Sequence, residues 1–259
     1  MSAASLLLGD SRFPAGGHAH SGGVEPAVTA GGVRDLVTLE AFLRGRLRTA
    51  GLAAAALAAT ACSGARGTGE ESAASVRNDD FWELLGAEAD ARMPSPAQRE
   101  ASRRQGRALL RAARVAWPEA RGLAEVATAV RSAHGAGGAG ESGGSIAGAG
   151  RLEYRGGPHH AVVLGAAAAA AGCTPGEAAR IAAYQSVAGP ASAAVRLLAL
   201  DPMRATGVLA RLAGEIDRVA DEGAGYAGRP LEDLPCLSAP ALDLLAETHI
   251  GAEVRLFES

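Results

Sequence analysis

The residues best suited to metal or proton chemistry in this chain are its histidines, and four of them occur in pairs. His18 and His20 form an HxH pair, whereas His159 and His160 are adjacent. The imidazole nitrogens of such pairs can bind a transition metal. A complete site needs three or four converging ligands, and the sequence places no third ligand near either pair. We therefore expect capping, loop or surface histidines and predict no metal site and no cofactor.

Two further patterns suggest chemistry and fall short of it. The glycine-rich run at residues 16–23 could cradle a phosphate. It matches neither GxGxxG nor GxxxxGK[ST], so it predicts a turn. Ser11, Ser21 and Ser186 lie outside any GxSxG context, and no Ser/His/Asp set can be recognised in the sequence. The residues alone thus predict no catalytic set.

The basic residues narrow the possible chemistry further. All 25 are arginine, and the chain contains no lysine. A phosphate-loop lysine and a Schiff-base lysine are therefore excluded. Arg196 falls on the flank of an alanine-rich helix, and Arg255 stands near the end of the chain. Either arginine could lend its charge to a phosphoryl-transfer partner, although most arginines are solvated or paired.

Composition and charge indicate a helical protein that binds neither nucleic acid nor membranes. The 28 acidic and 25 basic residues give a net charge of −3, which argues against nucleic acid or an anionic membrane as the main partner. Hydrophobic residues make up 48% of the chain, but many are alanine, and aromatic residues make up only 3%. Alanine is the best helix former and a poor strand former, so the composition predicts an all-α fold.

The cysteines and the apolar runs favour a cytoplasmic protein. Cys62, Cys173 and Cys236 are far apart and form no CxxC or Cys/His metal spacing, which is typical of a reducing compartment. The N-terminus lacks the basic and apolar regions of a signal peptide. The longest apolar runs, at residues 51–62 and 161–172, are too short to span a bilayer.

The stretch at residues 174–212 is expected to organise the fold as a helical hairpin. Thr174 can cap a helix, Pro175 suits its first position, and Glu177 completes a capping box. Apolar residues then recur at steps of three and four. Pro190 removes a backbone hydrogen bond, so we expect it to kink or split the first helix, and Pro202 begins the second.

The remaining chain reads as further helices joined by loops. We expect helices near residues 33–62, 70–92, 97–115, 117–134, 158–172 and 240–249. Residues 135–150 are dominated by glycine, which predicts a flexible loop, and residues 251–259 form a C-terminal tail. The sequence therefore predicts one domain over residues 1–259, an all-α compact bundle of roughly eight to ten helices.

Five segments, taken in order, resemble the urease accessory protein UreF family. Residues 10–25, DSRFPAGGHAHSGGVE, look like its signature D-S-x-F-P-x-G-x-x-x-x-S-x-G-L-E. Residues 99–110 resemble a segment R-x-A-S…G-x-x-L-L, and residues 159–172 resemble H-x-x-V-x-G-x-A-x-x-x-x-G. Residues 193–197 match A-A-V-R-L, and residues 248–259 resemble H-E-x-x-x-S-R-L-F-x-S. Each motif is modest, but five in the same order are specific.

The resemblance implies a non-enzymatic chaperone for nickel insertion. Members of the family are helical and dimerise, bind the accessory protein UreD (also called UreH) and recruit the GTPase UreG, and the assembly activates urease apoprotein. The lack of lysine fits this division of roles, because GTP hydrolysis and its P-loop would belong to the GTPase partner. The resemblance implies partner-binding roles for eight residues: His18, His20, Ser21, Glu25, Arg196, Arg255, Leu256 and Phe257.

Two alternatives remain open at this point. One is an all-α metal-binding enzyme that uses the histidines. The other is a diverged helical regulator without urease partners, because two glutamines of the family pattern after A-A-V-R-L are absent here, as are the glutamate and serine of the terminal motif.

Overall fold

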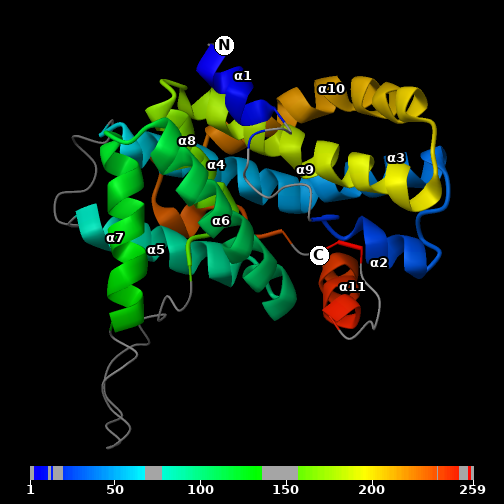
Figure 1. Ribbon diagram of the computed structural model, residues 1–259, viewed down its shortest axis with the longest axis horizontal. Coiled ribbons are helices and arrows are strands. Elements are labelled where there is room, and N and C mark those ends of the chain that lie inside the picture. The colour runs from blue at the N-terminus through cyan, green and yellow to red at the C-terminus, as the bar shows by residue number, and fades with distance from the viewer. Residues whose placement is uncertain are drawn as a thin grey trace, which may run out of the picture.

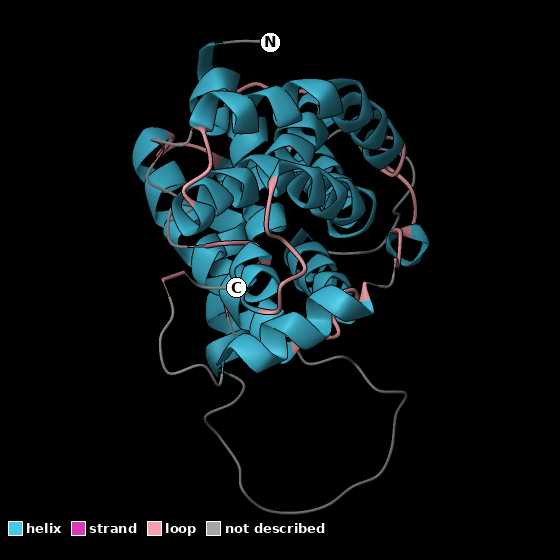
Figure 2. Ribbon diagram, turned by 90° about the vertical axis from the view of Figure 1, so that its right-hand side faces the viewer, coloured by secondary structure: helices cyan, strands magenta, loops and turns pink. Residues whose placement is uncertain are grey.

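All regular structure in the described part of the chain is helical. The computed structural model describes residues 3–10, 13, 20–67, 78–135, 157–237, 239–250 and 256–257. Within these ranges the chain forms α-helices, one π-helical turn and one 3-10 turn, and no strand (Figures 1 and 2). The predicted all-α bundle is confirmed. The glycine-rich segment at residues 136–150 lies outside the described residues.

The helices follow the chain in a simple order. They are α1 (Ala3–Gly9), α2 (Val24–Thr29), α3 (Leu36–Arg46), the π turn η2 (Leu47–Gly51), α4 (Leu52–Ala65), α5 (Asn78–Ala91), α6 (Pro96–Ala116), α7 (Arg121–Gly135), α8 (His160–Ala170), α9 (Pro175–Leu198), α10 (Pro202–Ala224), the 3-10 turn η3 (Leu231–Asp233) and α11 (Pro240–Ile250). None of the described helices is long and apolar enough to cross a lipid bilayer.

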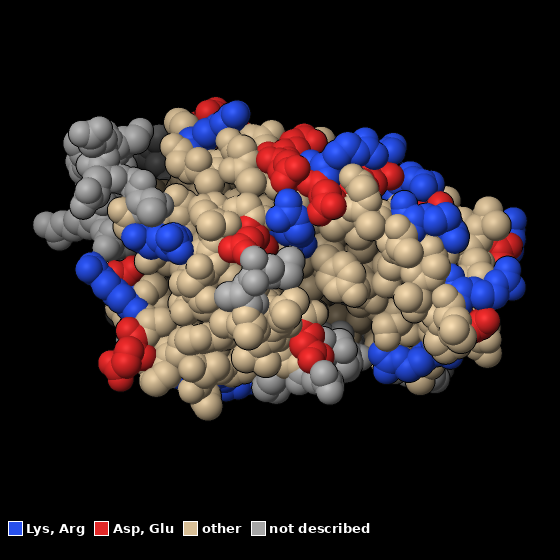
Figure 3. All heavy atoms as spheres, turned by 90° about the horizontal axis from the view of Figure 1, so that it is seen from above, with Lys and Arg blue, Asp and Glu red and all other residues tan. Residues whose placement is uncertain are grey.

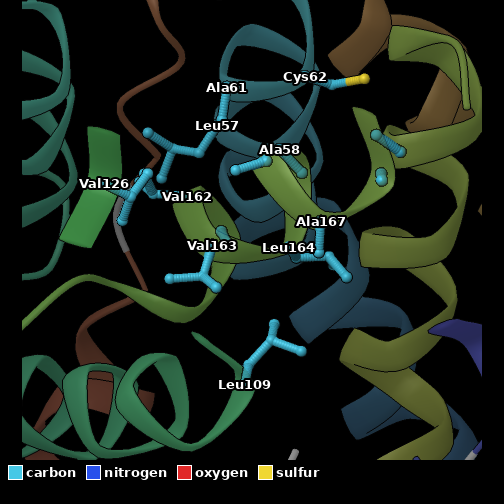
Figure 4. Close-up of a cluster of buried hydrophobic side chains, with 14 of the residues drawn as sticks. Leu57, Ala58, Ala61, Cys62, Leu109, Val126, Val162, Val163, Leu164 and Ala167 are labelled. Carbon is cyan, nitrogen blue, oxygen red and sulfur yellow. The ribbon is translucent and has the colours of Figure 1, made fainter. Parts of the chain in front are cut away.

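The centre of the bundle is the packing of α4 against α8 and α9. Alanines on almost every side of α4 and α8 are buried, so neighbouring helices approach them closely. Gly165 of α8 faces α4, and a Cβ atom at this position would lie 2.3 Å from the carbonyl oxygen of Ala58. Figure 4 shows the result, with Leu57 and Ala61 of α4 beside the valines at the start of α8. Contact between backbones, made possible by small residues, holds this centre together.

The expected hairpin of α9 and α10 is present, with one difference. Thr174 caps α9, since its hydroxyl accepts from the N–H of Glu177 (3.3 Å) while the Glu177 carboxylate accepts from the N–H of Thr174 (2.9 Å). However, α9 runs as one helix through Pro190, which does not split it. Pro190 is buried and its ring packs against the backbone of Gly22, so packing offsets the missing hydrogen bond.

Two other predicted helices differ in detail. The helix expected at residues 33–62 begins at Leu36, where Asp35 and Thr38 form a capping box, and contains the π turn η2 before α4. The helix expected from residue 70 is described only from Asn78, as α5. At the other end of the chain, α11 packs on α6 and α2 (Figure 1). On the face of the molecule seen in Figure 3, basic and acidic side chains lie next to one another.

Candidate partner-binding site

A buried glutamate ties the C-terminal tail to the N-terminal part of the chain. Glu25, in the first turn of α2, is only 6% exposed. One carboxylate oxygen accepts from the N–H of Leu256 (2.8 Å), and the other accepts from the N–H of Phe257 (2.9 Å). His249 Nε2, at the end of α11, lies 3.2 Å from the Phe257 carbonyl oxygen and 3.3 Å from Glu25 Oε2. These contacts close a polar clamp across 232 residues of sequence.

The two tail residues that the structure describes are both apolar, and one lies in the interior while the other lies at the surface. Phe257 is 7% exposed and belongs to the core formed with α3, α9 and α10. The guanidinium of Arg196 stacks over its ring, 4.6 Å from the centroid. Leu256 is 72% exposed. We expected both Leu256 and Phe257 to serve partners, but Phe257 folds back onto the chain's own core, and of these two residues only Leu256 is exposed.

The signature turn lies directly before this clamp. Gly22 and Gly23 adopt the left-handed backbone (φ of 58° and 88°), which confirms a turn at this end of the glycine-rich run. Ser21 is fully buried, so its side chain is not exposed to a partner in this arrangement. Thus four of the eight predicted partner-binding residues meet here: Glu25, Arg196, Leu256 and Phe257. His18 and Arg255 lie outside the described residues.

A cleft of about 570 Å³ opens beside the turn, bounded by α3, α6, α9 and α11. His20 and Arg196 line it, as does His160 of the adjacent histidine pair. Arg46 and Gln185, which the sequence did not single out, line it as well. Burial lowers the pKa of Arg46 to about 10. Burial and the nearby His20 lower the pKa of His160 to about 4, so this imidazole is neutral at pH 7. The cleft is therefore polar and carries desolvated charge.

A second polar cluster ties three helices together beneath the cleft. His159 is fully buried; its Nε2 lies 2.9 Å from Asp90 Oδ1, and its Nδ1 lies 3.1 Å from Ser102 Oγ. Arg103 also pairs with Asp90. Burial outweighs the carboxylate and lowers the pKa of His159, while His159 and Arg103 lower the pKa of Asp90. These residues resemble a Ser/His/Asp set, but the sealed imidazole serves to link α5, α6 and the start of α8.

The described residues offer no cluster for a metal ion. No three His, Cys, Asp or Glu side chains among them come close enough to share one. The three cysteines are free; Cys62 and Cys173 are buried, and Cys236 is exposed. Burial raises the pKa of the Cys62 thiol to about 12, which makes it inert as a nucleophile.

Sequence reasoning missed Arg46, Gln185 and His249 as site residues. Arg46 follows Leu39 and Leu43 on the predicted helix at a spacing that faces the core. A charge at a position that helical periodicity would bury was the available signal. Gln185 carried no comparable signal, whereas His249 stood in the terminal motif.

The fold and the site define a helical protein whose buried polar residues hold segments of the chain in place. Similarity to known proteins gives the family to which it belongs. The UreF family profile matches residues 33–213. The chain belongs to the UreF family of urease accessory proteins. Because this is a family of accessory proteins, the expectation of a non-enzymatic protein is confirmed.

Curated relatives match almost the whole chain. The urease accessory protein UreF of Mycolicibacterium vanbaalenii is 41% identical over 254 residues, which cover 98% of this chain and 97% of the relative. The protein of the same name from Mycobacterium marinum is 40% identical over the same shares. That of Mycobacterium tuberculosis H37Rv is 39% identical over 245 residues, covering 94% and 92%.

Proposed function

We propose that this urease accessory protein acts as a cytoplasmic chaperone for nickel insertion. It binds UreD (UreH) and recruits the GTPase UreG, and the assembly promotes maturation of the nickel metallocentre in urease apoprotein. Full-length similarity to curated UreF proteins supports the proposal, as does the absence of lysine, which leaves nucleotide hydrolysis to a partner. We further propose that the chain forms a homodimer within this assembly.

The observation that carries the proposal is the convergence of the signature turn, Arg196 and the tail. Glu25 fixes the backbone of residues 256–257, which holds the Leu256 side chain outward at 72% exposure. An exposed leucine on an anchored backbone can bury its surface against a partner at little entropic cost. We propose that this surface, together with His18, His20 and Arg255, contacts UreD or UreG, while the buried Ser21 acts only through the turn beside it.

A co-expression pull-down with cognate UreD and UreG tests the proposal. The wild-type chain should retain both proteins, and Leu256→Asp should lose at least one of them and reduce urease activation. Val115→Asp is the matched control, because Val115 is also exposed (83%) but lies at the end of α6. If wild type retains neither protein, the proposed function is wrong. If Leu256→Asp performs as well as Val115→Asp, the surface is wrongly placed.

A further inference from the structure

Arg46 differs from Arg44 and Arg48 because no carboxylate of the described residues pairs with it. Arg44 and Arg48, on the same helical segment, both pair with Glu215 of α10. Arg46 instead donates from Nε to the backbone carbonyl of Ser186 (2.9 Å). Its terminal nitrogens have no hydrogen-bond or ion-pair partner among the described residues.

The backbone around Arg46 holds the guanidinium in place. A Cβ atom at Gly22 would lie 3.3 Å from Arg46 Cζ and 2.8 Å from the Pro190 ring, so the left-handed glycine leaves just enough room. The π turn that follows Arg46 changes the direction in which this helix presents its side chains. Because Nε is bound to Ser186, the planar edge formed by the two terminal nitrogens stays uncommitted. That edge is the part of arginine that pairs with a carboxylate through two parallel hydrogen bonds.

Two other polar groups of the cleft, Gln185 and Arg196, fit a peptide that carries acid. Gln185 donates to the carbonyl of Leu8 (2.9 Å), while its buried Oε1 has no hydrogen-bond partner among the described residues. A buried acceptor without a donor is costly, and a backbone N–H from a bound segment would satisfy it. Arg196 adds a second guanidinium without a carboxylate in the described chain. Arg92 is already bound to Glu88 and to carbonyls in the η3 turn and just after it. The acids Asp10 and Asp243 also line the cleft.

We propose that the cleft binds an acidic segment of a partner protein, with a carboxylate of that segment paired to Arg46 and a backbone N–H donated to Gln185. The cleft volume of about 570 Å³ suits a few residues of such a segment. The proposal rests on the proposed function, because it names the chemistry by which one partner of the chaperone docks.

Fluorescence anisotropy with a labelled Gly-Glu-Glu-Gly peptide tests the cleft, and Gly-Gln-Gln-Gly is the matched uncharged peptide. The wild-type chain should bind the acidic peptide more tightly than the amide peptide. Arg46→Gln should weaken acidic-peptide binding by about tenfold or more, since it removes a desolvated charge from the pair. Arg114→Gln removes the same charge from the exposed last turn of α6 and should bind as wild type does.

Several outcomes would overturn the proposal. One is equal affinity of Arg46→Gln and Arg114→Gln for the acidic peptide. Another is equal affinity of the wild-type chain for the two peptides. A third is displacement of the labelled peptide by inorganic phosphate at the same concentration as by unlabelled peptide. If Arg46→Gln does not fold by circular dichroism, Arg46→Lys decides, because lysine keeps the charge and loses the planar edge. Wild-type affinity in Arg46→Lys overturns the two-bond pairing, and a loss of several-fold supports it.

Pull-downs separate this inference from the proposed function. Arg46→Gln should lose one of UreD and UreG when wild type retains both. If the variant loses the acidic peptide but keeps both proteins, the assignment of the cleft to these partners is wrong while the proposed function stands. If wild type retains neither protein, the proposed function fails, and peptide binding then shows independently whether the cleft accepts acid.

Discussion

The centre of the bundle and its C-terminal strap are held by opposite means. By strap we mean α11 together with residues 256–257. At the centre, Gly165 and the alanines of α4 bring backbones together with no room to spare. The strap buries Ala246 and Phe257, but its polar attachments are carboxylates. Glu247 accepts from the Ser95 hydroxyl and from the N–H of Ala97 (3.0 Å), and Glu25 accepts from the tail.

This difference predicts where the molecule can change. An added methyl group at the centre must displace backbone atoms, which lowers the free energy of unfolding of the whole domain. A hydrogen bond to a charged group contributes about 1.5–3 kcal/mol and can be exchanged for water or for a partner's donor. The centre should therefore unfold only when the whole domain unfolds, whereas the strap should be able to detach while the rest stays folded.

The largest effect is expected from Gly165→Ala. Alanine normally favours a helix over glycine by about 1 kcal/mol. Here its Cβ would lie 2.3 Å from the Ala58 carbonyl oxygen and 2.6 Å from the Ala61 Cβ, so we expect a loss of about 3 kcal/mol or more in the free energy of unfolding. Urea denaturation measures it.

Gly214→Ala is the matched control for Gly165→Ala. Gly214 is also inside a helix, α10, and no described atom lies within 4 Å of the position of its added Cβ. This variant should be as stable as wild type or up to about 1 kcal/mol more stable. Equal stability of the two variants would show that the centre yields, and the contrast with the strap would fail.

The second effect is a loss of stability at acidic pH, caused by the histidines buried in the bundle. The pKa of His160 falls to about 4 in the folded state from 6.5, so the unfolded chain binds more protons between these values. Stability should therefore fall as the pH drops from 6.5 to 4, by about 3 kcal/mol from this residue. The lowered pKa of His159 acts in the same direction.

Asp90 does not confuse this measurement, because its lowered pKa affects stability only below about 3.8. Urea denaturation at pH 7.5, 5.5 and 4.5 should show the loss in wild type and a smaller loss in His160→Gln. An identical slope in both proteins would mean that the imidazole is charged or solvated in the folded state.

The third effect should be confined to the strap. Glu25→Gln replaces one acceptor by an amide group that cannot accept from the tail, so one of the two tail hydrogen bonds is lost. We expect the Phe257 amide to exchange its hydrogen roughly 10-fold faster, which corresponds to about 1.4 kcal/mol of local stability. Global unfolding should change less. Glu222→Gln, an exposed acid on α10, is the control. Unchanged exchange in Glu25→Gln would contradict the clamp.

Sequence reasoning foresaw the helices better than their centre. The alanine content and the capping box at Thr174 are local signals. The first predicts helix in general, and the second predicts where α9 begins. In α4 and α8, however, alanines are buried on nearly every side, so no amphipathic stripe marks them as central. The hairpin at residues 174–212 therefore looked more important than α4. At Pro190 a local signal was misleading. An internal proline usually breaks a helix, but here tertiary packing keeps α9 continuous.

The candidate site residues were proposed from the resemblance, and their contacts could not be predicted from the sequence. Glu25, Arg196 and Phe257 were named because they match family motifs, but no spacing rule could pair residues more than 200 positions apart. Arg46 and Ser186 likewise meet across 140 residues. Such contacts depend on how helices pack, which periodicity along one helix does not reveal.

The smallest effect is the coupling between Arg196 and Phe257, and it separates a fold role from a partner role. A guanidinium stacked on an aromatic ring contributes about 0.5–1 kcal/mol at a partly exposed position. A double-mutant cycle of Arg196→Gln and Phe257→Leu by urea denaturation should return a coupling of about that size. Arg204→Gln, an exposed arginine in the first turn of α10, should show no coupling to Phe257.

The same variants then enter the pull-down with UreD and UreG. A loss of 1 kcal/mol leaves a typical domain folded, so weaker retention of a partner by Arg196→Gln at near-native stability would place the arginine's main role at the interface. If instead retention falls only where the tail also loosens, in Phe257→Leu and in Glu25→Gln alike, then Arg196 acts by seating Phe257, and the surface offered to partners is the one that the strap holds in place. Full retention in all three variants would mean that neither Arg196 nor the anchored tail contributes to partner binding.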